Sequence, residues 1–346
     1  MLIRSRLLLL VLVLSTMVSA QQRTVQKSPP VKPAETAESS TGKVTLSIFG
    51  DMNYVVNEPK LLDPSKGTSG RNDFLLNRAA FGYDHSFSRD AAARIQYDGA
   101  SNTILQAYAE VRNIQSFLDI KIGRMQTLST ETMEKVWDYR ALAPSVLERS
   151  GLTHEFDMGL ALTGRLNTSG ALYMKAAVYN GNGTAPENNK LKKTAIAIGD
   201  WLDRSSVVEV YADFENLSGN QNAINAKLSY GMNTTKFSLG AEAYYRLHRF
   251  TVTDSSISPV GASLMGAIEV SRGWKLVVRG DYNDQNISEG VNGYRIIYVT
   301  GGVDYSPVPE VRLLPNIVYE KHMEKENTPY ITDVITARLT MSVSLK

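Results

Sequence analysis

The chain has 346 residues, with 37 basic and 35 acidic side chains, 43% hydrophobic residues and no cysteine. The lack of cysteine excludes a disulfide scaffold, a thiolate metal site, a cysteine nucleophile and a lipid-modified cysteine behind a signal sequence. The balanced charge disfavours a nucleic-acid binder.

Residues 1–20 have the pattern of a secretory signal peptide. Arg4 and Arg6 precede the apolar run 7–14, and the small residues Val18-Ser19-Ala20 offer a cleavage site after Ala20. The apolar run is shorter than the roughly 20 residues that a spanning helix needs. Cleavage would leave 35 basic and 35 acidic residues. We therefore expect an exported, formally neutral mature chain.

Residues 21–42 form a second compositional segment. They are rich in Gln, Pro, Ser, Thr, Glu and Lys, and they carry almost no apolar side chain that could be buried. Such a segment cannot offset the entropy cost of ordering. It is expected to be a flexible periplasmic leader, and a short plug inside the following domain is the alternative.

From residue 43 onward, apolar and polar residues alternate with a period of two. Near the start, Val44, Leu46 and Ile48 alternate with Thr45 and Ser47. Alternate side chains of a β-strand point to opposite faces of its sheet. No stretch of this region reaches eighteen apolar residues, which excludes a helical membrane protein. The body is therefore predicted to be all-β, with one apolar face and one polar face.

Breaking this pattern at Gly, Asn, Pro, Ser and Asp clusters predicts sixteen strands. Most match the 9–11 residues that a tilted strand needs to cross a bilayer. The predicted strands are 44–56, 74–87, 91–99, 103–113, 117–124, 156–166, 170–180, 191–199, 205–214, 222–230, 235–246, 260–271, 274–284, 293–305, 310–320 and 332–346.

The connections between these strands alternate in length. Tight turns such as 88–90 and 272–273 follow the even strands, and a short link at 100–102 breaks the rule. Strict alternation of short turns and long loops is typical of transmembrane barrels. Residues 43–346 are therefore predicted to form an antiparallel β-barrel with both ends in the periplasm. The long connectors are 57–73, 125–155, 181–190, 215–221, 247–259, 285–292 and 321–331.

The polar face carries many charges of both signs. Sixteen to eighteen strands leave a water-filled lumen, and unpaired ions cannot line a dry core, so these charges are expected to face water. The predicted lumen wall includes Arg78, Arg94, Lys121, Arg165 and Lys175. The same face is expected to carry Lys227, Arg279, Glu209, Glu242 and Asp281.

The connector 125–155 is the longest in the body. In a sixteen-stranded barrel it occupies the place of a third extracellular loop that folds inward and narrows the pore. Lys135, Arg140 and Arg149 are the candidates for anion contact at this constriction, with Arg124 at the loop base, because charges at a narrow point set ion preference. The alternative is that Glu148 and Arg149 only pin the loop to the wall.

Several short motifs occur in a familiar order and resemble the phosphate-selective porin O/P family. They are Phe74-Leu75-Leu76-Asn77-Arg78-Ala79-Ala80-Phe81-Gly82-Tyr83, Ala93-Arg94-Ile95-Gln96-Tyr97-Asp98, Ile122-Gly123-Arg124, Glu148-Arg149-Ser150, Phe156-Asp157-Met158-Gly159-Leu160 and Val178-Tyr179-Asn180-Gly181. The resemblance implies a homotrimeric outer-membrane pore that passes phosphate-like or other small anions past lumenal arginines and lysines. Since the polar face is mixed in sign, a general diffusion pore for small hydrophilic solutes remains the alternative.

Other functions find little support in the sequence. The four histidines, His85, His154, His248 and His322, have no serine and acid at a recognisable spacing, so no catalytic residue is assigned. No His/Cys cluster predicts a metal, and no cofactor is expected. An outer-membrane hydrolase and a non-conducting structural or adhesive barrel remain the competing classes. The expected surroundings of the barrel are outer-membrane lipid, and no nucleic-acid partner is expected.

Overall fold

The computed structural model describes residues 40–56, 70–187, 190–287, 293–325 and 328–345. The expected signal peptide, 1–20, and most of the expected leader, 21–42, lie outside the described residues. Thr41 and Gly42 already belong to the first strand, so the sheet begins two residues before the predicted start at 43.

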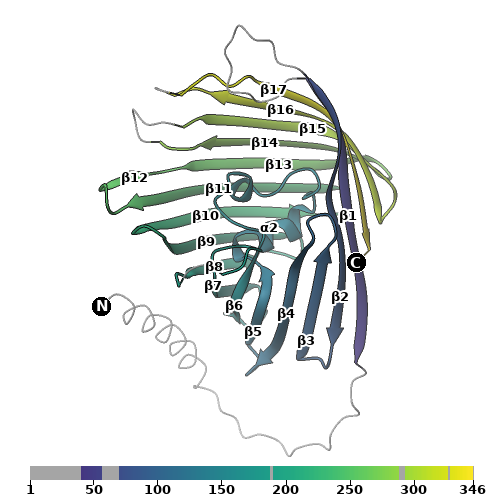
Figure 1. The fold of residues 1–346 in the computed structure, drawn as a ribbon. Helices are drawn as coiled ribbons and strands as arrows, with labels where there is room; N and C mark the ends of the chain where they lie inside the picture. The colour runs from purple at the N-terminus through teal and green to yellow at the C-terminus, as the bar shows by residue number, and fades with distance from the viewer. Residues whose placement is uncertain (1–39, 57–69, 188–189, 288–292, 326–327, 346) are drawn as a thin grey trace, which may run out of the picture. The chain divides into compact units, whose positions relative to one another are not determined.

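The described residues form one antiparallel sheet that closes on itself, because β1 pairs with both β2 and β17 (Figure 1). The short β12 pairs only with the end of β11, and the ring itself has sixteen strands. The strands are β1 Thr41–Val55, β2 Arg71–Ser86, β3 Ala91–Asp98, β4 Thr103–Ile114, β5 Leu118–Gln126, β6 Phe156–Arg165, β7 Leu172–Tyr179, β8 Lys193–Trp201, β9 Ser206–Leu217, β10 Gln221–Asn233, β11 Phe237–Phe250, β12 Ser255–Ile257, β13 Val260–Ser271, β14 Trp274–Asp284, β15 Arg295–Val308, β16 Val311–Met323 and β17 Val334–Leu345.

The predicted strands are confirmed, and the differences lie at the connectors. β9 and β10 extend toward each other, so the predicted long connector 215–221 is a turn of residues 218–220. The connector 247–259 is partly sheet, because β11 continues to Phe250 and β12 pairs back onto it. In both places polar residues such as Asn216 and Thr253 led to the prediction of a loop. In the structure, Asn216 pairs with Asn222 of β10, and the N–H of Thr253 donates to the Phe250 carbonyl in a tight turn.

The two faces of the sheet differ as the alternation predicts. The outward side chains are large, apolar and exposed: Leu264 and Ile317 are each 61% exposed, and Val278 is 58% exposed. Their neighbours in sequence point inward, where Ser263 and Arg279 are buried. An apolar exterior of this kind matches lipid, in which a sheet must leave no unpaired edge.

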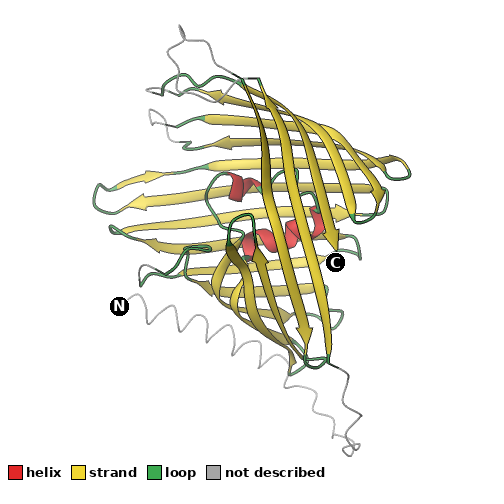
Figure 2. Ribbon diagram, turned by 45° about the vertical axis from the view of Figure 1, so that its right-hand side comes forward, coloured by secondary structure: helices red, strands yellow, loops and turns green. Residues whose placement is uncertain are grey.

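Two helices lie in the segment between β5 and β6: α2, Leu128–Trp137, and α3, Val146–Arg149. Figure 2 shows both helices, in red, within the ring of strands. None of the helices in the described part of the chain is long and apolar enough to cross a membrane.

Two facing glycines bring α2 close to the sheet. Gly231 on β10 and Gly240 on β11 are register partners, and they form a flat patch under the helix. A Cβ atom on Gly231 would lie 2.8 Å from Val136 Cγ1, and one on Gly240 would lie 3.2 Å from Met133 Cε. Larger residues at these positions would therefore push α2 away from the wall.

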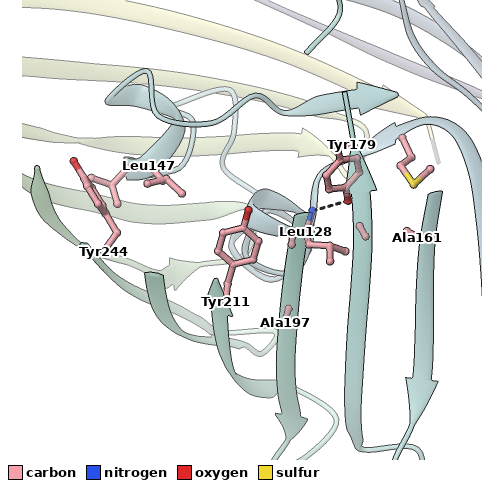
Figure 3. Close-up of a cluster of buried hydrophobic side chains, with 11 residues drawn as sticks. Leu128, Leu147, Ala161, Tyr179, Ala197, Tyr211 and Tyr244 are labelled. Carbon is pink, nitrogen blue, oxygen red and sulfur yellow. Dashed lines mark hydrogen bonds between the residues drawn. The ribbon is translucent and has the colours of Figure 1, made fainter. Parts of the chain in front are cut away.

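Small inward residues on the strands leave room for a hydrophobic core inside the barrel (Figure 3). Ala161 and Ala197 belong to one buried cluster with Leu128 and Leu147 of the β5–β6 segment, in which Leu147 lies beside Tyr244. The hydroxyl of Tyr179 accepts a hydrogen bond of 3.2 Å from the Leu128 N–H, which would otherwise be an unpaired donor in the first turn of α2. One side of the interior is thus a packed, dry core.

The apolar exterior can be tested by placing a charge on it. Leu264→Arg should lower the free energy of unfolding by about 2–4 kcal/mol, since an arginine on a lipid-facing position near the middle of a strand loses its hydration. Denaturant unfolding in lipid vesicles measures the change. The control is Ser344→Arg on the inner face of β17, beside Glu310, where about 0.5 kcal/mol or less is expected. Equal losses for the two variants would contradict the assignment of the faces.

Candidate functional site

The segment of residues 127–155 is anchored to the wall by cations that bind its backbone. Arg279 Nη1 donates to the carbonyl of Ala143 at 3.0 Å, and Arg338 Nη2 donates to that of Leu142 at 2.7 Å. Hydrogen bonds from charged donors are stronger than neutral ones. Two further anchors run from Lys227 to the Ser129 carbonyl and from Arg312 to the Asp138 carbonyl.

Acidic wall residues accept hydrogen bonds from the same segment. Glu209 accepts from the hydroxyl of Thr132 at 2.6 Å, and Asp304 accepts from that of Tyr139 at 2.8 Å. Each acid is nearly inaccessible to solvent, with side-chain exposures of 1% and 2%. The segment is therefore held by charged groups of both signs, over β9 on one side and β15 on the other.

The expectation that inward charges must face water is wrong for one part of the wall. Lys227 and Glu242 are 2.9 Å apart with side-chain exposures of 1% and 0%, and Arg279 and Asp281 form a similar pair at 2.8 Å. Glu209 is also buried. Buried charges are tolerated when they are paired and hydrogen-bonded, and here the β5–β6 segment completes the pairing.

Another part of the wall, formed by β1–β4, β16 and β17, keeps open space beside it. We name two cavities there. The first, of about 390 Å³, lies between the β5–β6 segment and the wall, and we call it the β1–β17 cavity; its lining includes Ser47, Phe49, Arg78, Arg140, Arg312 and Ser342. The second, of about 270 Å³, we call the β2–β4 cavity; its lining includes Lys43, Asp84, Arg94, Tyr108, Glu110 and Arg112.

Arg140, a predicted constriction residue, lies at the centre of a charged cluster. Its guanidinium contacts Glu134, and it forms ion pairs with Glu148 at 2.6 Å and Glu155 at 2.7 Å. Arg78 from β2 holds Glu155 with two hydrogen bonds, of 2.9 and 2.5 Å. Three carboxylates therefore surround two guanidinium groups.

Arg149, the second predicted arginine, is bound to the wall. It contacts Glu320 on β16, lies 3.6 Å from Asp281 on β14, and stacks at 3.6 Å on the ring of Tyr298. This matches the alternative reading in which Arg149 pins the segment. Glu148, by contrast, binds Arg140 within the segment itself.

The other two predicted constriction residues lie apart from this cluster. Lys135 is exposed near the end of α2, with its Nζ atom 6.0 Å from the ring centroid of Trp201. Arg124 alternates with the inward Met125 and lies on the same, outward side as Ile122, where it donates to the Ile104 carbonyl at 2.8 Å. The structure thus brings Arg78 and Arg140 together and separates Arg124, Lys135 and Arg149 from them.

The predicted lumen-wall cations all face the interior, and each has an acidic neighbour. Besides Arg78, Arg94 pairs with Asp84 at 2.6 Å. The other pairs are Arg165 with Asp119 at 3.0 Å, Lys175 with Glu131 at 2.7 Å, and Lys121 with Glu110 and Glu131 at 3.9 Å each.

Phe49 is a lining residue that the sequence analysis did not single out. Its ring is inside the barrel with Arg78 above it, the guanidinium carbon lying 5.4 Å from the ring centroid. The signal was present in the sequence, because Phe49 alternates in step with Ser47 and Asp51 on the polar face of β1. An aromatic residue in a polar register is unusual enough to be noticed.

Two lysines of the wall lower the pKa of Glu131 on α2. Its side chain is 31% exposed. Burial within the barrel would raise its pKa, but Lys175 and Lys121 outweigh that effect and hold the pKa below its ordinary value. Glu131 therefore carries its charge at neutral pH and fixes α2 to β5 and β7.

The described residues show no metal-binding cluster, and three of the four histidines have the partners given below. These residues contain no group of three or more His, Asp or Glu placed to hold a metal ion. His85 contacts the hydroxyls of Ser40 at 2.8 Å and Tyr83 at 3.0 Å, on an exposed outer position without a carboxylate behind it. His248 binds Gln221, and His322 lies 3.3 Å from Glu320.

Comparison with known proteins identifies the class of fold to which the barrel is similar. No protein-family model and no curated sequence matches the chain. Among solved structures, OmpT of Vibrio cholerae is 12% identical, with a TM-score of 0.65, and the match covers 90% of this chain and 99% of that one. The anion-selective porin from Comamonas acidovorans is 8% identical, with a TM-score of 0.66 and coverages of 89% and 100%. The outer-membrane channel DcaP of Acinetobacter baumannii is 11% identical, with a TM-score of 0.64 and coverages of 90% and 100%.

The chain thus has the closed sixteen-stranded barrel fold of outer-membrane porins and channels. At such low identity the likeness extends to the fold, and the narrower resemblance to the phosphate-selective porin O/P family remains an expectation from the sequence.

The buried anchor can be tested by removing Lys227. Lys227→Met should destabilise the barrel by about 3–5 kcal/mol, because Glu242 would be left buried without its partner. Chemical denaturation of the refolded protein measures the loss, and adding Glu242→Leu should restore most of it. Lys192→Met, at the exposed pair with Glu187, is the control and should cost about 1 kcal/mol or less. A loss of stability for Lys227→Met no larger than that of the control would contradict the burial of the Lys227–Glu242 pair.

The lowered pKa of Glu131 predicts a pH dependence. A carboxyl whose pKa is depressed on folding stabilises the fold above the ordinary value of 4.5, and this stabilisation disappears as the pH falls through the lowered value. The stability difference between the native chain and Glu131→Gln should stay constant from about pH 8 to about pH 5.5 and shrink at more acidic pH. Unfolding curves across this range measure it. A difference already lost near pH 6 would indicate a raised pKa instead.

Proposed function

We propose that this protein is an outer-membrane porin, a water-filled channel for passive diffusion of small hydrophilic solutes. The observation that carries the proposal is the uneven interior of the barrel. The β5–β6 segment packs against one part of the wall, while charged and hydroxyl side chains line open cavities along β1–β4, β16 and β17. An apolar exterior, a closed sheet and a partly open polar interior are what a diffusion pore requires.

The path of the solute follows from this arrangement. The β2–β4 cavity and the β1–β17 cavity lie along the same part of the wall, on one side of α2. A solute crossing the barrel passes the wall cations Arg94, Lys121 and Arg78, and α2 contributes Glu131, which lies 3.9 Å from Lys121, and Glu134. The constriction is the gap between these wall residues and the helix.

Weak charge preference is the proposed selectivity of this constriction. The arginines expected to attract anions, Arg78, Arg140 and Arg149, are each bound to carboxylates, which cancels most of their field. The selection is then mainly by size, as in a general diffusion pore.

A preference for phosphate-like anions is the second candidate. The β2–β4 cavity favours it, because Lys43, Arg94 and Arg112 face only two acids there, Asp84 and Glu110. In the described part of the chain, Lys43 has no ion pair. A porin of similar fold is described as anion-selective.

The remaining assignments belong to the same proposal. The protein is not an enzyme, it is exported by a cleaved signal peptide at 1–20, and residues 21–40 form a periplasmic leader. It assembles as a homotrimer, as one structural neighbour, OmpT of Vibrio cholerae, is described in a trimer form. The third extracellular loop is the segment 127–155.

Planar-bilayer recording tests the channel and its charge balance together. The purified protein should give discrete ohmic conductance steps with a reversal potential close to zero in a salt gradient. Arg140→Gln removes one positive charge from among three carboxylates, so the cation-to-anion permeability ratio should rise by about twofold to fivefold. Arg204→Gln, in the turn between β8 and β9, is the matched control and should leave this ratio unchanged.

Three results would change these assignments. A protein that inserts without conducting would be a structural or adhesive barrel. Strong anion selectivity that survives Arg140→Gln would favour the phosphate-type pore, and selectivity lost on replacing Lys43 would place the selective step in the β2–β4 cavity.

A further inference from the structure

The β1–β17 cavity has a feature that a simple diffusion path does not need. Two register pairs of the β1–β17 ladder, Ser47 with Ser344 and Phe49 with Ser342, place three hydroxyls and one aromatic ring side by side on the inner face. Within the described residues, none of these three hydroxyls has a hydrogen-bond partner. Each can donate one hydrogen bond and accept two.

The charged groups in the rest of the cavity lining are already satisfied. Arg140 is bound by Glu134 and Glu148, and Arg312 donates to Asp138 at 2.6 Å. The guanidinium groups therefore have little attraction left for an anion, whereas a paired carboxylate retains free lone pairs that accept further hydrogen bonds.

The charge count in the cavity also disfavours an anion. The lining has three arginines, Arg78, Arg140 and Arg312, and three acids, Glu134, Asp138 and Glu310. Behind the lining, Glu148 and Glu155 pair with the same arginines. An incoming anion would meet more carboxylates than guanidinium groups. The protein would therefore not replace the hydration that the anion loses on entering the cavity.

A neutral solute with many hydroxyls fits this lining. Its hydroxyls can bond both to the serine row and to the satisfied carboxylates, and an apolar face of its ring can pack on Phe49. The volume, about 390 Å³, is within the roughly 300–1,000 Å³ of small-molecule pockets.

We propose that the β1–β17 cavity is a binding subsite for neutral polyhydroxyl solutes, that is, for small sugars, on the path through the barrel. This inference rests on the proposed channel function and deepens it. Phe49 provides the packing surface, and Ser47, Ser342 and Ser344 provide the hydrogen bonds. The subsite raises the local concentration of such solutes at the constriction, so that they cross faster than solutes of equal size without hydroxyls.

Sucrose is the probe for a binding experiment that does not depend on conduction. Isothermal titration of the detergent-solubilised full chain should show saturable binding of sucrose and none of a polyethylene glycol of similar size. Phe49→Leu should weaken sucrose binding by about fivefold, the loss of one ring contact. The pair Ser342→Ala and Ser344→Ala should weaken it by a similar factor, since a solute hydroxyl then loses its partner.

Phe81→Leu is the matched control, because it makes the same change on the outward face of the neighbouring β2. It should leave sucrose binding unchanged. In a planar bilayer, sucrose should also reduce the ion current of the native channel reversibly, and it should do so less in Phe49→Leu.

The possible outcomes separate the two proposals. A protein that conducts but shows no sucrose binding overturns the subsite and leaves the channel intact. Sucrose binding without conduction supports the subsite and overturns the channel. Equal binding in Phe49→Leu and Phe81→Leu, or displacement of sucrose by inorganic phosphate at the same site, also overturns the polyhydroxyl subsite.

Discussion

The closure of the sheet between β1 and β17 is the constraint on which the rest of the structure depends. An open sheet would leave two rows of unpaired backbone groups, which lipid cannot satisfy. Ten register pairs, from Leu46 with Leu345 to Val55 with Thr336, complete the ring. Closure also fixes which side chains share an enclosed interior, so residues far apart in sequence meet there. Arg149 and Glu320, for example, are 171 residues apart in sequence and are in contact inside the ring.

Inside the ring, side-chain size decides which space is filled and which stays open. On β6–β8 four inward positions are alanines, Ala161, Ala177, Ala195 and Ala197, and they share a buried cluster with Leu128 and Leu147 of the β5–β6 segment. On β10 and β11 the facing glycines admit α2. Along β1, β16 and β17 the β5–β6 segment presents Glu134, Asp138 and Arg140 to the β1–β17 cavity, which stays open beside the contacts made by Arg312 and Arg338. The interior therefore has a dry part that gives stability and an open part suited to solutes.

Much of the fold could be predicted from the sequence, because a period of two and the spacing of turns are local signals. The strands 260–271 and 274–284 were predicted with the bounds that the structure has. The inward direction of Arg94 and Lys175 followed from the same parity. Whether an inward charge is wet or dry could not be predicted, since it depends on distant partners: Lys227 is buried by Ser129, and Arg140 is neutralised by acids of its own segment. The sequence shows charges, and only the fold shows their pairing.

The anchoring of the β5–β6 segment through its carbonyl groups has a consequence for how such a protein can change. Every residue type has a carbonyl oxygen, so the grip of Arg279 on Ala143 and of Arg338 on Leu142 does not depend on which side chains stand at positions 142 and 143. The path of the segment therefore does not depend on the side chains that the segment presents to the interior of the barrel. Substitutions at the exposed residues of this segment can change which solutes the barrel prefers without changing the fold around the segment.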